Sequence, residues 1–135
     1  MNGNIFLDTN ILIYTYSTTE PTKQSIARNL VTSNQIFIST QVLQELANVL
    51  NMKFKVDWVQ VSQVLLECSN NFQILNNNEF VISDACRVAD KYKYSFYDSL
   101  IISAALQANC NTLYSEDMTH NHLLDGSLRI LNPFV

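Results

Sequence analysis

The sequence predicts an α/β fold in which a parallel sheet of four to five strands is covered by helices on both faces. Short apolar runs of strand length alternate along the chain with longer segments whose apolar residues recur at helical spacing. Such alternation is typical of strands joined by crossover helices. The chain has 135 residues, which suits one domain with a substantial core. Because no linker, internal repeat or low-complexity tract divides it, we expect a single domain over residues 1–135.

The first half of the chain contains two short apolar runs that predict buried strands, each followed by a helical pattern. The predicted elements are, in order, a strand at Ile5–Leu7 closed by Asp8-Thr9-Asn10, a helix over Ile11–Tyr16, a helix from Pro21 to near Asn34, a strand at Ile36–Ile38, and a helix capped by Ser39 or Thr40. Proline suits a first helical turn, and Ser and Thr cap helices by accepting a hydrogen bond from a free N–H there.

The second half continues the alternation. The predicted elements are, in order, a helix capped by Asp57, a strand at Phe72–Leu75, a helix carrying Val81 to Tyr92, an apolar helix opened by Asp98, a strand at Asn111–Tyr114, a polar loop at His120–His122, and a strand at Leu128–Leu131. Glycine occurs only at Gly3 and Gly126, so turns rely on Asn, Ser and Asp. A glycine-rich phosphate-binding loop is therefore excluded.

Charge and hydropathy limit the classes of function. The net charge of −4 and the pI of about 4.9 argue against binding nucleic acid through a broad basic face, although cations held in an acidic pocket invert its local field. No apolar run approaches the roughly 18 residues of a membrane span, and the N-terminus lacks a signal sequence. We therefore expect a cytoplasmic protein that does not bind membranes. Cys68, Cys86 and Cys110 form no C-x-x-C pair and are expected to be reduced.

Four acidic residues lie where predicted strands end or the next helices begin: Asp8, Glu45, Asp98 and Asp117. Each alone is compatible with a helix cap, a turn or a solvent-exposed position. Together they are expected beyond the carboxyl ends of the strands, where open α/β sheets bind ligands. Carboxylates gathered there repel one another unless a cation lies between them, and Mg²⁺ or Mn²⁺ prefers oxygen ligands. We therefore expect metal-dependent chemistry on a phosphate ester.

Three segments of the chain, Ile5–Leu12, Phe96–Ala105 and Leu113–Asp117, resemble those of the PIN-domain nucleases, particularly the VapC-type toxins of toxin–antitoxin pairs. Glu45 fits the second acidic position of that family, and the resemblance extends from about Asn4 to Val135. The resemblance implies a PIN-like three-layer sandwich with a five-stranded parallel sheet. It also implies cleavage of single-stranded RNA with Mg²⁺ or Mn²⁺.

Carried over by position, the resemblance implies one set of site residues and several partners. The catalytic and metal-binding residues are Asp8, Glu45, Asp98 and Asp117, and the supporting polar residues are Thr9, Asn10 and Ser115, with Glu116 in reserve for Asp117. Carboxylates in such a site hold one or two ions that activate water and bind the scissile phosphate. The implied partners are an RNA substrate, a protein antitoxin and a second copy of the chain.

Other interpretations remain open at this point. The chain can be an RNA-processing nuclease outside any toxin–antitoxin pair, or a catalytically silent interaction module whose partner surface includes Trp58. A haloacid-dehalogenase-type phosphatase requires a second acid where Asn10 stands, which disfavours it. His120 and His122 are expected to be solvated rather than catalytic. A tRNA, an rRNA loop and an mRNA all suit the predicted site, since specific RNA recognition usually targets unstacked bases.

Overall fold

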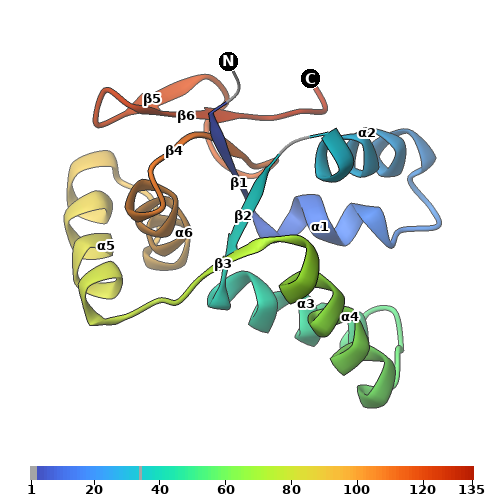
Figure 1. Cartoon of the computed structure of the whole chain (residues 1–135). Coiled ribbons are helices and arrows are strands. Elements are labelled where there is room, and N and C mark those ends of the chain that lie inside the picture. The colour runs from blue at the N-terminus through green and yellow to red at the C-terminus, as the bar shows by residue number, and fades with distance from the viewer. Residues whose placement is uncertain (1–2, 34) are drawn as a thin grey trace.

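The computed structural model describes residues 3–33 and 35–135 and has the α/β architecture that the sequence predicts (Figure 1). In these ranges the helices are α1 (Thr9–Thr15), α2 (Pro21–Ser33), α3 (Thr40–Met52), α4 (Trp58–Asn71), α5 (Glu79–Tyr92) and α6 (Phe96–Gln107). The strands are β1 (Asn4–Leu7), β2 (Ile36–Ser39), β3 (Gln73–Leu75), β4 (Cys110–Tyr114), β5 (His122–Leu124) and β6 (Leu128–Leu131). None of these helices is long and apolar enough to cross a membrane.

The strands form one sheet in the order β3-β2-β1-β4-β6-β5. All neighbouring pairs are parallel except β5 and β6, so the predicted parallel sheet is confirmed and carries one antiparallel strand at its edge. β1 lies between β2 and β4, and Leu7 pairs with Tyr114. This register places Asp8 and Ser115, the residues that follow the two strands, side by side at the carboxyl edge of the sheet.

The predicted polar loop at His120–His122 is one residue too long, because His122 is the first residue of β5. Asp125 and Gly126 turn the chain between β5 and β6, and both have positive φ, 50° and 69°. Asp-Gly between apolar residues is a strong hairpin signal, since both positions of such a turn require the left-handed region. The Asp125 carboxylate accepts hydrogen bonds from Arg87 (2.8 Å) and Tyr92 (2.6 Å), which attach this hairpin to α5.

Two helices begin earlier than predicted. α1 begins at Thr9 rather than Ile11, because the Asp8 side chain caps it by accepting from the Thr9 N–H. α6 is capped by Ser95, whose Oγ accepts from the N–H of Asp98. Asp98 is therefore the third residue of α6 and not its cap, so its carboxylate is free to serve another purpose. The expected end of the second helix, Asn34, lies outside the described residues.

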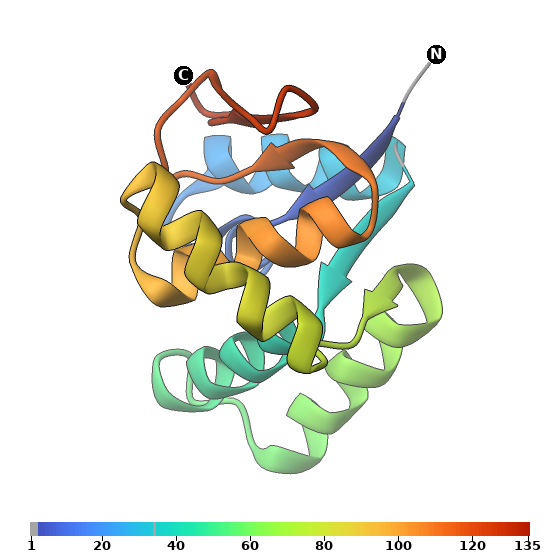
Figure 2. The same ribbon diagram turned by 90° about the vertical axis from the view of Figure 1, so that its left-hand side faces the viewer.

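Helices cover both faces of the sheet. α5 and α6 lie on one side and α1 and α2 on the other, while α3 and α4 form a hairpin that projects beyond the sheet (Figures 1 and 2). The side chains of Phe6 and Leu7 in β1 are fully buried, and α6 is buried from Ser99 to Ala105. Asp8, which follows β1, and Asp98, in the first turn of α6, are therefore attached to deeply buried elements.

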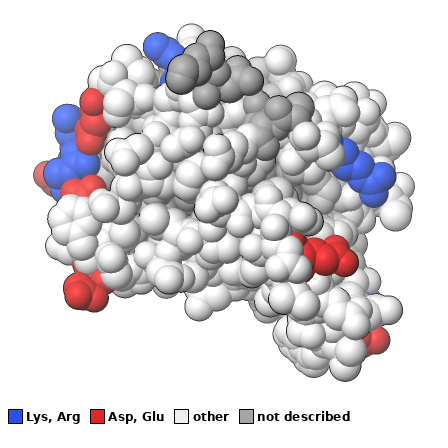
Figure 3. Space-filling model, viewed as in Figure 1, with Lys and Arg blue, Asp and Glu red and all other residues white. Residues whose placement is uncertain are grey.

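Positive charge is sparse on the surface. The face shown in Figure 3 is largely uncharged, and its basic side chains lie toward the margins. Lys23, Arg87, Lys91 and Lys93 are each engaged by a neighbouring carboxylate. This face therefore offers no broad basic surface for nucleic acid, which is consistent with the net charge of −4.

Candidate active site

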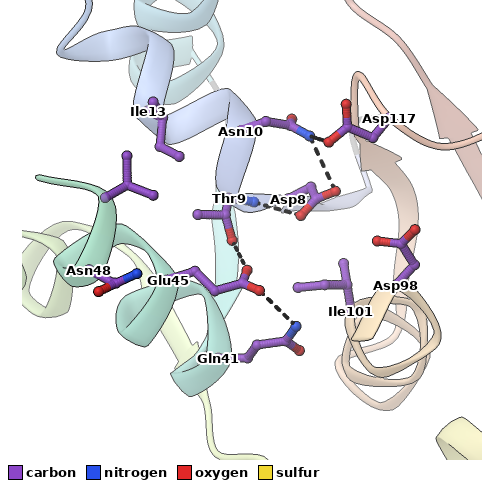
Figure 4. Close-up of a pocket in the computed structure, with 11 residues that line it drawn as sticks. Asp8, Thr9, Asn10, Ile13, Gln41, Glu45, Asn48, Asp98, Ile101 and Asp117 are labelled. Atoms are coloured by element: carbon purple, nitrogen blue, oxygen red, sulfur yellow. Dashed lines mark hydrogen bonds between the residues drawn. The ribbon is translucent and has the colours of Figure 1, made fainter. Parts of the chain in front are cut away.

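All four predicted acidic residues lie around one pocket of about 310 Å³ at the carboxyl edge of the sheet (Figure 4). The pocket is lined by Asp8, Thr9, Asn10, Ile13, Gln41, Glu45, Asn48, Val49, Asp98, Ile101 and Asp117. Asp8 follows β1, Glu45 and Asp98 lie on α3 and α6, and Asp117 lies in the loop after β4, so residues far apart in the sequence converge as predicted. No lysine or arginine is among these lining residues. The pocket is therefore strongly acidic.

Asp8 is the most buried of the four carboxylates, with 7% of its surface exposed. Its oxygens accept hydrogen bonds from the Thr9 N–H (2.7 Å) and the Ser115 hydroxyl (2.8 Å). Burial raises the pKa of Asp8 from its ordinary value of 3.8 to about 6, against the lowering effect of these bonds. The nearby carboxylates of Asp98 and Glu45 raise it further. Asp8 is thus a charge that lacks a compensating cation.

Glu45 lies in the second turn of α3 and is half-buried. The Thr9 hydroxyl donates to its Oε1 at 2.5 Å, and the Gln41 amide donates to its Oε2 at 3.3 Å. These two bonds come from different elements, α1 and α3. They fix the orientation of the Glu45 carboxylate at the wall of the pocket.

Asp98 and Asp117 lie nearer to solvent. Burial is the main cause that raises the pKa of Asp98, and the carboxylates of Asp117 and Glu45 add to the effect, while the Ser95 hydroxyl lowers it. Asp117 is exposed, and its Oδ2 accepts a hydrogen bond from the Asn10 amide at 3.0 Å. This bond joins the start of α1 to the loop after β4.

Glu116 takes no part in the pocket, which separates its role from that of Asp117. Its carboxylate accepts hydrogen bonds from Lys23 (2.6 Å) and from the Tyr14 hydroxyl (2.6 Å). Burial acts to raise the pKa of Glu116, but the hydrogen bonds from Lys23 and Tyr14 together have the larger effect. The pKa of Glu116 therefore lies below its ordinary value. The structure therefore uses Glu116 to hold the turn after β4 against α1 and α2.

The donor set suits a hard divalent cation, but the carboxylates are not yet gathered around one point. Among the residues that the structure describes, no three Asp, Glu, His or Cys side chains are close enough together to hold a metal ion as they stand. The oxygen-only ligand set and the uncompensated charge of Asp8 and Asp98 nevertheless fit Mg²⁺ or Mn²⁺.

Several lining residues were not predicted from the sequence. Gln41, Asn48 and Val49 lie three or four positions from Glu45 on α3 and so share its side of the helix. This helical spacing from Glu45 was the sequence pattern that could have identified them as lining residues. Ile13 and Ile101 supply apolar walls, and such residues cannot be distinguished from core residues in a sequence pattern.

Replacing Ser115 with alanine is expected to destabilise the protein, by about 1–3 kcal/mol, because buried Asp8 then loses a hydroxyl donor. Loss of that donor raises the Asp8 pKa further. A raised carboxyl pKa in the folded state favours folding at low pH, so the stability loss should grow as pH rises through about 6. Urea unfolding at pH 5 and pH 8 measures this trend. Ser103→Ala is the control, because Ser103 is also buried but donates to the Val81 carbonyl. The stability lost in Ser103→Ala should therefore not depend on pH.

Comparison with known proteins agrees with this geometry. A sequence profile of the PIN domain matches residues 5–123. The fold resembles that of a toxin–antitoxin complex from Klebsiella pneumoniae, with a TM-score of 0.73 and 21% identity over 96% of this chain and 97% of that one. It also resembles VapC20 of Mycobacterium tuberculosis, a toxin that cleaves the sarcin–ricin loop, with a TM-score of 0.68 and 18% identity over 84% and 91% of the two chains.

A third similar structure is DNA-bound VapBC from Salmonella typhimurium, with a TM-score of 0.64 and 18% identity over 96% of this chain and 97% of that one. No curated protein sequence matches the chain. At these identities the solved structures establish a shared fold, while the activity of this chain has to be argued from its own residues.

Proposed function

We propose, from the premise that this chain belongs to the PIN-domain family, that it is a Mg²⁺- or Mn²⁺-dependent endoribonuclease that hydrolyses single-stranded or loop RNA. The observation that carries the proposal is the convergence of Asp8, Glu45, Asp98 and Asp117 on one pocket whose lining contains no basic side chain. A cation would relieve the repulsion among these carboxylates, and a divalent ion held by them can activate water and bind a phosphate oxygen.

The residues of the chain have distinct roles in this proposal. In this proposal Asp8 and Asp98 would hold the ion directly, and Asp117 would hold it directly or through water. The Thr9 N–H and the Ser115 hydroxyl hold the Asp8 carboxylate in place. Glu45, oriented by Thr9 and Gln41, would hold a second ion or the attacking water.

We further propose that the chain is the toxin of a type II toxin–antitoxin pair, regulated by a protein antitoxin. Its fold is shared with proteins crystallised in toxin–antitoxin complexes. Several large apolar side chains on the α3–α4 hairpin, including Met52, Trp58, Val59 and Leu66, are more than 60% exposed, as expected of a protein-binding surface. A homodimer is proposed on the same grounds, and light scattering of the purified protein tests it.

The proposed activity predicts that the purified protein cleaves RNA in the presence of Mn²⁺ or Mg²⁺ and not in EDTA. Asp98→Asn should lower the rate at least about 100-fold, because a ligand that bears charge is lost. The assay uses a panel of single-stranded RNA, tRNA and rRNA fragments, and the fragment ends identify the target. Glu79→Gln, an exposed acid outside the pocket, is the matched control. Cleavage that persists in EDTA, or equal cleavage by Asp98→Asn, would contradict the proposal.

A further inference from the structure

Gln41 occupies an unusual position beside the candidate active site. It lies in the first turn of α3, one turn before Glu45, and only 6% of its surface is exposed. Its Nε2 donates one hydrogen bond to Oε2 of Glu45 (3.3 Å) and another to the backbone carbonyl of Tyr97 (3.2 Å). Figure 4 shows the amide between Glu45 and the part of the pocket formed by α6.

The orientation of this amide is determined by its partners. A carboxylate oxygen and a backbone carbonyl both accept hydrogen bonds, so both need the two N–H groups of Nε2. Turning the amide over would direct Oε1 of Gln41 toward two acceptors and lose both bonds. In the orientation that satisfies them, Oε1 is buried and has no hydrogen-bond partner among the described residues.

A buried carbonyl oxygen without a donor is costly, so stability alone does not account for a glutamine here. An apolar side chain of similar length would fill the same space without leaving an unpaired group. Residues that break a local rule of this kind are expected at functional sites, where another requirement outweighs stability.

We propose that Gln41 is a positioning residue that sets the distance and orientation between the two acid-bearing helices at the pocket. Through Glu45 it fixes one carboxylate, and through the Tyr97 carbonyl it holds the first turn of α6, in which Asp98 is the next residue. The role of Gln41 in catalysis rests on the proposed nuclease activity. Its role in holding α6 against α3 does not.

The test compares Gln41→Met with Gln44→Met. Methionine has the length of glutamine but no donor, and Gln44 is an exposed residue on the same helix, so it controls for the change of residue type. Three quantities are measured: hydrogen exchange of the amides at 96–99 in the metal-free protein, Mn²⁺ affinity by calorimetry, and the kcat and KM of RNA cleavage. The melting temperature is recorded for both variants.

For Gln41→Met we expect kcat to fall about 10-fold and Mn²⁺ affinity to weaken several-fold, as when a group that orients a metal ligand is removed. KM for RNA should stay within about 2-fold, because Gln41 does not contact substrate in this proposal. Exchange at 96–99 should become several-fold faster, while the melting temperature stays equal to or above that of the wild type. Gln44→Met should match the wild type in every measurement.

Unchanged exchange at 96–99 in Gln41→Met would overturn the proposal, since the turn of α6 would then not depend on this amide. A large fall in melting temperature in both Gln41→Met and Gln41→Leu, with kcat per folded molecule unchanged, would also overturn it and leave Gln41 a purely structural residue. If the wild type cleaves no RNA, the nuclease proposal fails by itself. Exchange and Mn²⁺ affinity then still decide whether Gln41 positions the two helices.

Discussion

Replacing Asp8 with asparagine is expected to eliminate metal-dependent RNA cleavage and, at the same time, to raise the melting temperature of the metal-free protein at pH 7.5. Asp8 is the buried carboxylate at the centre of the acidic pocket. Its raised pKa of about 6, compared with 3.8 ordinarily, means that its ionised form opposes folding by roughly 3 kcal/mol. Asparagine has the same shape, accepts the hydrogen bond from the Thr9 N–H, and is a good helix cap.

The net gain should be smaller than that figure, because a neutral amide accepts weaker hydrogen bonds than a carboxylate does. We expect about 1–2 kcal/mol, or roughly 4–8 °C in melting temperature for a domain of this size. The pH dependence follows from the sign of the shift. The protonated Asp8 carboxyl favours folding below about pH 3.8, and this contribution is lost as pH rises through about 6. The difference in melting temperature between Asp8→Asn and the wild type should therefore become smaller toward pH 4.

Differential scanning calorimetry in EDTA at pH 4 to 8, together with the RNA cleavage assay, measures both effects. Asp57→Asn is the matched control, because Asp57 also caps a helix, α4, but is exposed and lies outside the pocket. It should change neither activity nor the pH trend. A melting temperature that falls at pH 7.5 in Asp8→Asn would show that Asp8 is stabilising as an anion, contrary to the effect expected of its burial.

Addition of Mn²⁺ is expected to stabilise the wild-type protein strongly at neutral pH. A ligand that binds only the folded state at about 100 times its dissociation constant adds roughly 2.7 kcal/mol, or about 10 °C in a domain of this size. The physical reason is that the ion neutralises carboxylates that are costly to ionise. Burial is the main cause that raises the pKa of both Asp8 and Asp98, and the neighbouring carboxylates of the pocket raise it further. Protons compete with the ion, so the shift should be much smaller at pH 5.

Thermal unfolding with increasing MnCl₂ or MgCl₂, at constant ionic strength, measures this stabilisation. Asp8→Asn should lose most of the shift, whereas Glu79→Gln should keep it, since Glu79 is exposed and does not line the pocket. If the wild type gains no stability from either ion at pH 7.5, the acidic pocket does not hold a divalent cation. The interpretation of the chain as a catalytically silent interaction module would then be favoured.

The sequence alone was sufficient to predict the α/β class, the parallel sheet, and the convergence of the four acids. These features depend on local patterns, apolar runs and the residues that end them, and on the general rule that parallel strands share a carboxyl edge. Asp8 illustrates this, because a buried strand followed by an acid already places a charge at that edge.

Other features depended on the tertiary structure. The sequence favoured Asp117 as the fourth acid but kept Glu116 in reserve, because the partner of Glu116, Lys23, lies 93 residues away and only the fold brings the two together. Gln41 was equally hidden, since its significance comes from a bond to Tyr97, 56 residues further along the chain. Hydrogen-bond partners are chosen by distances and angles among segments that only packing brings together. Periodicity in a sequence indicates which face of a helix or strand a residue occupies. Only the fold determines which residues it contacts there.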